Sequence, residues 1–299
     1  MSAAVFDGDQ RLIALSDEVY VFGSYPFCGV VATDAGCIAI DGPMSPRNNR
    51  PWAEFIAGLG PLRYQVYCEH HEDHIASAPF LAPEILISSQ GTRTEMASTA
   101  DMLASFDGWA HDPRLEPGSL DGFAMRYPTV TYSGRIVLEL GGKTFELFEA
   151  PGHTSGSTVV HAVDDRVAFV ADNTFTPAIQ SGDPFAWLHT IDTLEALDVD
   201  WYVQGHAEPI RRDRLAVWRS VLLDAIDRAR EMRASGLTPL DVVERGGVFA
   251  GYVRPDHVGA ADTPPNLRTF SSTVLQEEGA RRMFAALERH DGPLRGSAG

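Results

Sequence analysis

Short apolar runs broken by polar turns fill the first third of the chain. Segments 11–23 and 29–43 are rich in Val, Ile and Ala and are interrupted by Gly and Asp, a pattern typical of strands joined in hairpins. Residues 47–60 instead have helical composition, with Pro51 near the expected first turn and glycines at the end. The pattern therefore predicts paired strands followed by a helix.

Strand-like and helix-like segments continue to alternate through the middle of the chain. Further strands are expected over 63–68, 84–89, 130–142, 144–152, 157–165, 166–175 and 201–205. Helices are expected over 75–82, 92–106 and 190–198. Asp73 stands where it could cap the first of these helices. Residues 107–128 carry Gly, Pro, Trp and Tyr without a clear period, and we expect a long loop or lid there.

The character of the chain changes after Pro209. Segments 212–236 and 271–290 have the spacing of long amphipathic helices. Because strands and helices before this point alternate in two strand-led batches, we expect an α+β fold, an αββα sandwich of two mixed β-sheets with helices outside. The expected organisation is one such domain over 1–210 and a mostly helical C-terminal extension over 211–299 that packs on the same domain.

Composition and charge narrow the range of partners. The formal net charge is −17, and an acidic protein repels polyanions. We therefore expect no nucleic-acid partner and no membrane partner, and the sequence contains no apolar run of the roughly 20 residues needed to span a bilayer. The sequence has three cysteines, Cys28, Cys37 and Cys68. A small and odd number of cysteines argues against a disulfide framework. With no basic, apolar N-terminal leader, a cytoplasmic location is expected.

Residues able to bind metal or move protons gather where the expected strands end. They are Glu69, His71, Asp73 and His74, then His153, then Asp172, then His206. In an extended segment, residues two apart face the same side, so the first three of these can converge while His70 and Glu72 face away. His74, at the turn into the next helix, can reach the same cavity. Seven donors are too many for one tetrahedral ion and suit two ions bridged by a carboxylate.

The order and spacing of these residues resemble the metallo-β-lactamase superfamily. The series here is E-x-H-x-D-H at 69–74, a Gly-His at 152–153, an Asp ending a strand at 172, and a second Gly-His at 205–206. The superfamily usually opens this series with H-x-H-x-D-H. The match covers most of residues 10–210 in order and spacing, so the resemblance implies the sandwich fold and a dinuclear metal site.

The resemblance also implies roles for individual residues. A first metal position would use Glu69, His71 and His153, and a second would use Asp73, His74 and His206. Asp172 would bridge the two ions. Asp41, in the Asp-Gly pair that ends the strand CIAID, is similar to an early Asp of the superfamily that supports the site without binding metal.

Glu69 is the departure from the usual pattern. An anionic oxygen donor here replaces a neutral imidazole, which leaves four histidines and three carboxylates in the set. Oxygen-rich sites shift preference from zinc toward iron or manganese. The flavodiiron branch of the superfamily has a similar inventory, although it places Glu at the position that His71 occupies here. Glu69 could be a tolerated zinc ligand, part of an iron site, or the cause of a weakened first position beside one firmly held ion.

The resemblance implies a hydrolase that uses two divalent metal ions, zinc first, with iron or manganese as the alternatives. The expected reaction is hydrolysis of an ester, lactone, thioester or amide bond of a small molecule by a metal-activated water. Asp73 would orient the water and pass a proton to the leaving group. An alternative is a non-haem di-iron oxidoreductase or oxygenase that receives electrons from a partner. A third alternative is a sensor or scaffold with a structural metal.

Substrate-binding residues are the least defined part of the prediction. Tyr25 and Phe27 lie on an early hairpin that flanks the site in members of the superfamily. Phe175 stands where acyl-homoserine lactonases carry a Tyr, and His189 could line the pocket. The C-terminal helices could cover this pocket or form a homodimer.

Overall fold

Two units make up the chain in the computed structural model, which describes residues 11–24, 26–44, 46–98, 124–174, 179–249 and 265–291. The first unit contains both β-sheets and comprises the chain up to Ala150, Gly156–Phe175 and Asp198–Arg212. The second unit is mainly helical and comprises Pro151–Ser155, Thr176–Leu197 and Asp213 onward. This division differs from a single boundary at residue 210, because a helix from the middle of the chain belongs with the C-terminal helices.

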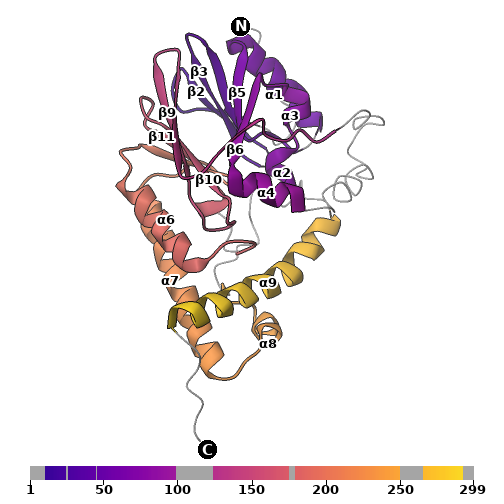
Figure 1. The fold of residues 1–299 in the computed structure, drawn as a ribbon, viewed down its shortest axis with the longest axis vertical. Helices are drawn as coiled ribbons and strands as arrows, with labels where there is room; N and C mark the ends of the chain where they lie inside the picture. Colours follow the sequence, from indigo (N-terminus) through magenta and orange to yellow (C-terminus); the bar gives the residue numbers. More distant parts are fainter. Residues whose placement is uncertain are drawn as a thin grey trace, which may run out of the picture. The chain divides into compact units, whose positions relative to one another are not determined.

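The first sheet of the sheet-containing unit has its strands in sequence order. They are β1 (Arg11–Ala14), β2 (Val19–Gly23), β3 (Cys28–Thr33), β4 (Gly36–Ile40), β5 (Leu62–Tyr67), β6 (Ile85–Ser89) and β7 (Val130–Tyr132). Figure 1 labels β2, β3, β5 and β6 of this sheet in the indigo-to-purple part of the ribbon. The pairs from β1 to β4 are antiparallel, and those from β4 to β7 are parallel. The change at β4 coincides with the first helix, because parallel neighbours need a crossover connection.

The second sheet is also mixed. Its strands are β8 (Arg135–Leu140), β9 (Lys143–Glu149), β10 (Thr158–Ala162), β11 (Val167–Ala171) and β12 (Trp201–Gln204), in the order β12-β11-β10-β9-β8. Only the β11–β12 pair is parallel among these strands. Two mixed sheets with helices confirm the expected α+β architecture.

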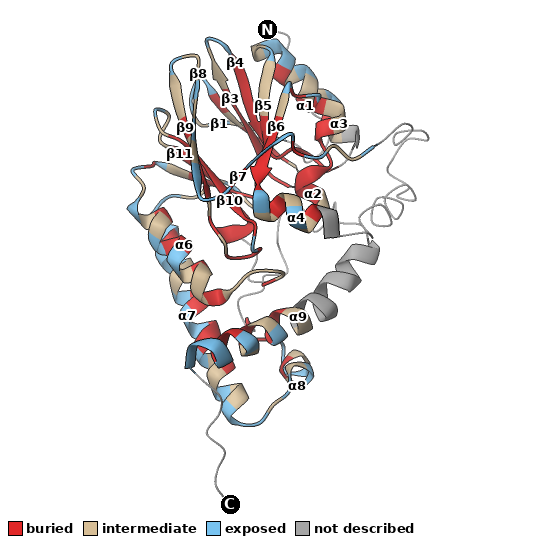
Figure 2. Ribbon diagram, in the orientation of Figure 1, coloured by how far each residue is buried: buried red, intermediate tan, exposed pale blue. Residues whose placement is uncertain are grey.

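Alternate residues of the strands form the main core, which contains side chains of both sheets. Val19 and Val21 of β2 and Phe145 and Leu147 of β9 are buried in this one cluster. The two-residue spacing follows from the strand geometry, in which successive side chains point to opposite faces. Figure 2 shows the buried residues concentrated along the strands of both sheets.

The other face of the first sheet is covered by helix α1 (Pro46–Leu59). Trp52 and Ile56 of this helix are buried with Phe22 of β2 and Val30 of β3. The rings of Trp52 and Phe22 stack with their centroids 5.2 Å apart. The helix expected over 47–60 is thus present, and it buries an apolar stripe against the sheet.

Short helices follow the parallel strands of the first unit, and longer helices form the second unit. The first group is α2 (Glu72–Ile75), α3 (Ala78–Leu81), α4 (Gln90–Ser98) and the 3₁₀ helix η1 (Asp172–Thr174). The second group is α6 (Pro184–Ala196), α7 (Asp213–Ala234), α8 (Pro239–Glu244) and α9 (Pro265–Asp291). Ion pairs join helices of the second group, as between Arg219 of α7 and Asp192 of α6 at 3.0 Å. Among the described helices, none combines the length and apolar character that crossing a membrane requires.

The structure corrects the helix expected over 75–82. Two short helices, α2 and α3, replace it, and α2 already begins at Glu72. Asp73 is therefore inside the first turn and does not cap it, while His71 stands at the N-cap position without a side-chain cap hydrogen bond. Of the lid expected over 107–128, residues 107–123 lie outside the described part of the chain.

Gly29 of β3 provides a test of the packing between the sheets. A Cβ at this position would lie 2.1 Å from Cε1 of Phe169, whose ring is 2 % exposed in the core. We expect Gly29→Ala to lower the free energy of unfolding by about 1–3 kcal/mol, because the buried ring has no room to move. Urea unfolding measures this.

The matched control is Gly58→Ala. Gly58 is an exposed residue of α1, and an added Cβ would meet nothing within 4 Å. Since Ala favours a helix over Gly, this variant should be about 0.5–1 kcal/mol more stable. Equal stability of the two variants would contradict the described packing.

Candidate metal centre

The candidate site is built where strands of both sheets end. Glu69 lies two residues after β5, Asp172 directly follows β11, and His206 lies two residues after β12. Asp73 and His74 lie in α2, which starts five residues after β5 ends. Strand ends place side chains at fixed positions, because the hydrogen-bonded sheet fixes the backbone from which they leave.

Two groups of possible metal ligands converge within the sheet-containing unit. Asp73, His74 and His206 form one, and Glu69, His74 and Asp172 form the other. In each group the ligand atoms all lie within 4.8 Å of one another, and all of these residues are buried. His74 belongs to both groups, so the two share one centre.

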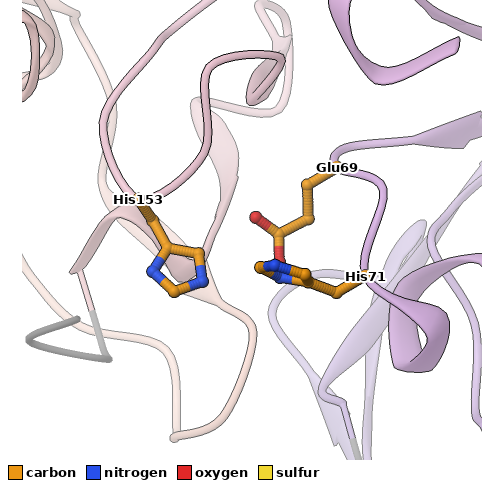
Figure 3. A group of neighbouring side chains, drawn as sticks. All are labelled: Glu69, His71 and His153. Atoms are coloured by element: carbon orange, nitrogen blue, oxygen red, sulfur yellow. The ribbon is translucent and has the colours of Figure 1, made fainter. Parts of the chain in front are cut away.

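His153 lies on the loop between β9 and β10. The N–H of Ala150 donates to the carbonyl of Ser157 at 2.7 Å, which closes this loop where the strands begin to pair. The ligand atoms of Glu69, His71 and His153 also lie within 4.8 Å of one another, and Figure 3 shows these side chains as neighbours. The structure thus brings together each of the seven predicted ligands in one or more groups.

Carboxylates and imidazoles alternate through this cluster. His206 Nε2 lies 3.1 Å from Asp73 Oδ2 and 3.1 Å from Asp172 Oδ2. His74 Nε2 lies 3.3 Å from Glu69 Oε1 and 3.6 Å from Asp172 Oδ1. The longer distances around His74 exceed those of a good hydrogen bond. These distances of 3.3 and 3.6 Å are instead those expected between separate ligand atoms that face one ion.

Burial and opposite charges shift the pKa values of the cluster strongly. Burial lowers the pKa of His206, but the carboxylates of Asp172 and Asp73 raise it to about 9. Burial raises the pKa of Asp73, but His74 and His206 lower it to about 2. The pKa of the Asp172 carboxylate is likewise raised by burial but held well below its ordinary value by His206 and His74. Asp73 and Asp172 are thus ionised and need buried positive charge beside them, which protonated imidazoles or a cation can supply.

Asp41 fixes the orientation of His74. Its Oδ2 lies 2.9 Å from His74 Nδ1, and its Oδ1 accepts a hydrogen bond from the N–H of Cys68 at 2.8 Å. With Nδ1 donating to Asp41, Nε2 of His74 faces the cluster as a lone-pair donor, the state that metal binding requires. Asp41 has a φ of 53°, a left-handed conformation that Asp tolerates better than most residues.

Gly205 leaves the space in which this cluster meets. A Cβ here would lie 2.0 Å from Asp172 Oδ1 and 3.0 Å from His74 Cε1. The N–H of Gly205 donates to the carbonyl of Ala171, and its own carbonyl accepts from Phe27. Only a residue without a side chain fits, so the glycine of the 205–206 pair has a steric role.

The donor set fits divalent metal ions. Buried imidazole nitrogens and carboxylate oxygens are the ligands that zinc, iron and manganese accept, and the supporting hydrogen bond to His74 is typical of metal-binding histidines. The groups centred on His74 and on the Glu69–His71 pair correspond to the two positions implied by the sequence motif.

The predicted substrate-binding residues are scattered. Phe27 is 3 % exposed and packs in the core between the sheets, so its ring has little surface to offer a substrate. His189 lies on the exposed side of α6 in the second unit. Tyr25 and Phe175 lie outside the described residues.

Sequence reasoning missed two residues that support the site. The amide Nε2 of Gln65, buried in β5, donates to the backbone carbonyl of Asp41 at 2.9 Å. Glu95 of α4 pairs with Nδ1 of His70 at 2.7 Å and so holds the loop between two candidate ligands. A polar Gln in the buried part of a strand was the available signal for the first, and the sequence offered none for the second.

A family model described as the metallo-beta-lactamase superfamily matches residues 22–206. Among curated proteins, the chain is 28 % identical over 210 residues to 2,4-dinitroanisole O-demethylase subunit alpha from Nocardioides sp., covering 66 % of this chain and 58 % of that protein. It is 26 % identical over 286 residues to a linear primary-alkylsulfatase from Pseudomonas sp., covering 82 % and 53 %. The chain thus spans a little over half the length of these relatives.

Solved structures share the fold at lower identity. An inverting sec-alkylsulfatase from Pseudomonas sp. has a TM-score of 0.66 at 16 % identity, over 96 % of this chain and 51 % of that one. A metallo-beta-lactamase from Pontibacter korlensis has a TM-score of 0.58 at 16 % identity, over 72 % of this chain and 100 % of that one.

Gly205→Ala tests the geometry of the cluster. The added Cβ would displace the carboxylate of Asp172 and the ring of His74, and we expect the affinity for Zn²⁺ to fall by about 10-fold or more. Titration of metal-free protein by calorimetry measures this. Gly58→Ala, at an exposed position of α1, is the control, and Zn²⁺ binding equal to wild type in Gly205→Ala would exclude the described arrangement.

Proposed function

Because the chain belongs to the metallo-beta-lactamase superfamily, we propose that it is a metal-dependent hydrolase of small molecules. The observation that carries this proposal is the buried centre around His74, where two groups of imidazole and carboxylate donors meet. An exposed acidic cluster would need no ion. Buried ionised carboxylates that face imidazole nitrogens are instead arranged as metal ligands.

The donors divide into two positions in this proposal. Glu69, His71 and His153 would hold one ion, and Asp73, His74 and His206 would hold the other. Asp172 has one oxygen toward His74 and the other toward His206. Both contacts are with donors of the second position, and Asp172 also forms a group with Glu69, which is a donor of the first position. Its role as the carboxylate shared by the two ions is what the superfamily motif implies.

Two divalent ions, if held by these donors, would supply an acidified water and polarise the bond to be cleaved. The chain's own groups then set the geometry. Asp73 is ionised and 8 % exposed, so its carboxylate would accept a proton from the attacking water and then pass that proton to the leaving group. Asp41 keeps His74 in one tautomer, and the buried surroundings exclude bulk water.

In this proposal the enzyme cleaves an ester, lactone, thioester or amide bond. The names of the relatives add esters of sulfuric acid as a further candidate substrate class. One relative is named for removing a methyl group from an oxygen, and two are named as alkylsulfatases. These names share a bond between an oxygen and an alkyl carbon. We therefore place alkyl sulfate esters and aryl alkyl ethers in the substrate screen beside carboxylic esters, lactones and thioesters.

Elemental analysis of protein purified without added metal, with an absorption spectrum, tests the proposal first. About two zinc ions per chain would support a hydrolase, and turnover in the screen should then be lost with a chelator and restored by Zn²⁺. Iron with a visible charge-transfer band would instead favour the di-iron oxidoreductase that the oxygen-rich donor set also allows. Oxygen consumption would be the next measurement in that case.

Asp73→Asn tests the proton-transfer role. Asn cannot accept the proton, so we expect kcat to fall by about 10²–10⁴-fold with a smaller change in KM. Steady-state kinetics on the best substrate of the screen measures this, with metal content checked in parallel. Glu72→Gln, which removes a neighbouring carboxylate outside the described ligand groups, is the matched control. An unchanged kcat in Asp73→Asn would refute the role.

A further inference from the structure

Glu69 occupies a position between the two proposed metal positions. It belongs to the group with His71 and His153 and also to the group with His74 and Asp172. Of the seven predicted ligands, Glu69 and His74 are the two that occur in more than one of the groups found in the described residues. His74 can offer only its Nε2 to the centre, because Nδ1 faces Asp41.

The distances from Glu69 fit contact with both positions. Its Oε1 lies 2.8 Å from His71 Nδ1 and 3.3 Å from His74 Nε2. Two ligand atoms about 2.1 Å from one tetrahedral ion lie roughly 3.4 Å apart. The 3.3 Å distance to His74 Nε2 matches this spacing, whereas the 2.8 Å distance to His71 Nδ1 is that of a hydrogen bond. The carboxylate of Glu69 thus touches a donor of the first position and lies at ligand spacing from a donor of the second.

A carboxylate can use this placement, whereas the usual histidine could not. Each imidazole nitrogen has one lone pair and binds one ion, but the two oxygens of a carboxylate offer about four lone-pair sites. We propose that Glu69 is a second bridging ligand, which joins the two ions together with Asp172. This inference rests on the proposed dinuclear site.

The mutual repulsion of two metal ions gives a physical reason for a second bridging carboxylate. Two divalent ions a few ångströms apart repel each other, and the side chain of Glu69 is fully buried, where this repulsion is poorly screened. A carboxylate between the ions offsets part of the repulsion from both sides. The buried charge of Glu69 is in turn compensated by both ions, which removes the cost of leaving it isolated.

The competing arrangement has Glu69 as a terminal ligand of the first ion only. In that arrangement Glu69 would replace the missing histidine and nothing more. The two arrangements differ in one respect that can be measured, namely whether Glu69 contributes to binding at the position formed by Asp73, His74 and His206.

Single-site backgrounds separate the arrangements. His153→Ala removes a ligand of the first position and His206→Ala removes a ligand of the second, so each background retains one intact position. Metal-free protein of each background, with and without Glu69→Gln, is titrated with Co²⁺ and followed by visible absorption. Glu72→Gln in the same backgrounds is the control, and circular dichroism checks that each variant is folded. His71→Ala replaces His153→Ala if that variant does not fold.

If Glu69 bridges the two ions, Glu69→Gln should weaken Co²⁺ binding by about 10-fold or more in both backgrounds. Loss in only one background, or in neither, would overturn the bridge while leaving the proposed hydrolase intact. Failure of the wild-type protein to bind Co²⁺ at all would overturn the proposed function together with the bridge.

Discussion

The hydrogen bond between Asp41 and His74 is the constraint on which the candidate site depends. Both residues are buried, and Asp41 has a left-handed backbone conformation with a φ of 53°. The same carboxylate accepts the N–H of Cys68, which ties the end of β4 to the end of β5. One side chain thus joins the ends of two paired parallel strands to the ring of His74.

The cluster around His74 depends on strand ends from two sheets. β5 brings Glu69 and the start of α2, while β11 and β12 bring Asp172 and His206. The packing of side chains such as Phe145 and Phe169 between the sheets holds these ends in place. The apolar core therefore supports the polar site, because charged groups converge only where a rigid framework resists their repulsion.

Glu69 links the unusual feature of the sequence to a specific geometry. A histidine at this position would add one neutral donor to one ion. The carboxylate instead lies next to ring nitrogens of both proposed positions, and it lowers the net charge of the centre. A single change of residue type can therefore alter both the ion preference and the coupling between two ions.

The sequence alone indicated the strand pattern, the two mixed sheets and the seven candidate ligands that the structure brings together, because two-residue apolar alternation and motif spacing are local properties of the chain. It did not determine that Glu95 pairs with His70, that Gln65 holds Asp41, or that α2 starts early enough to place Asp73 inside its first turn. Only the tertiary structure decided these three features. The first two depend on segments distant in sequence, and the third depends on whether Asp73 caps the helix or points into the cluster. The closeness of Glu69 to both His71 and His74 is decided in the same way, by how the chain turns after β5 within the packed sheets.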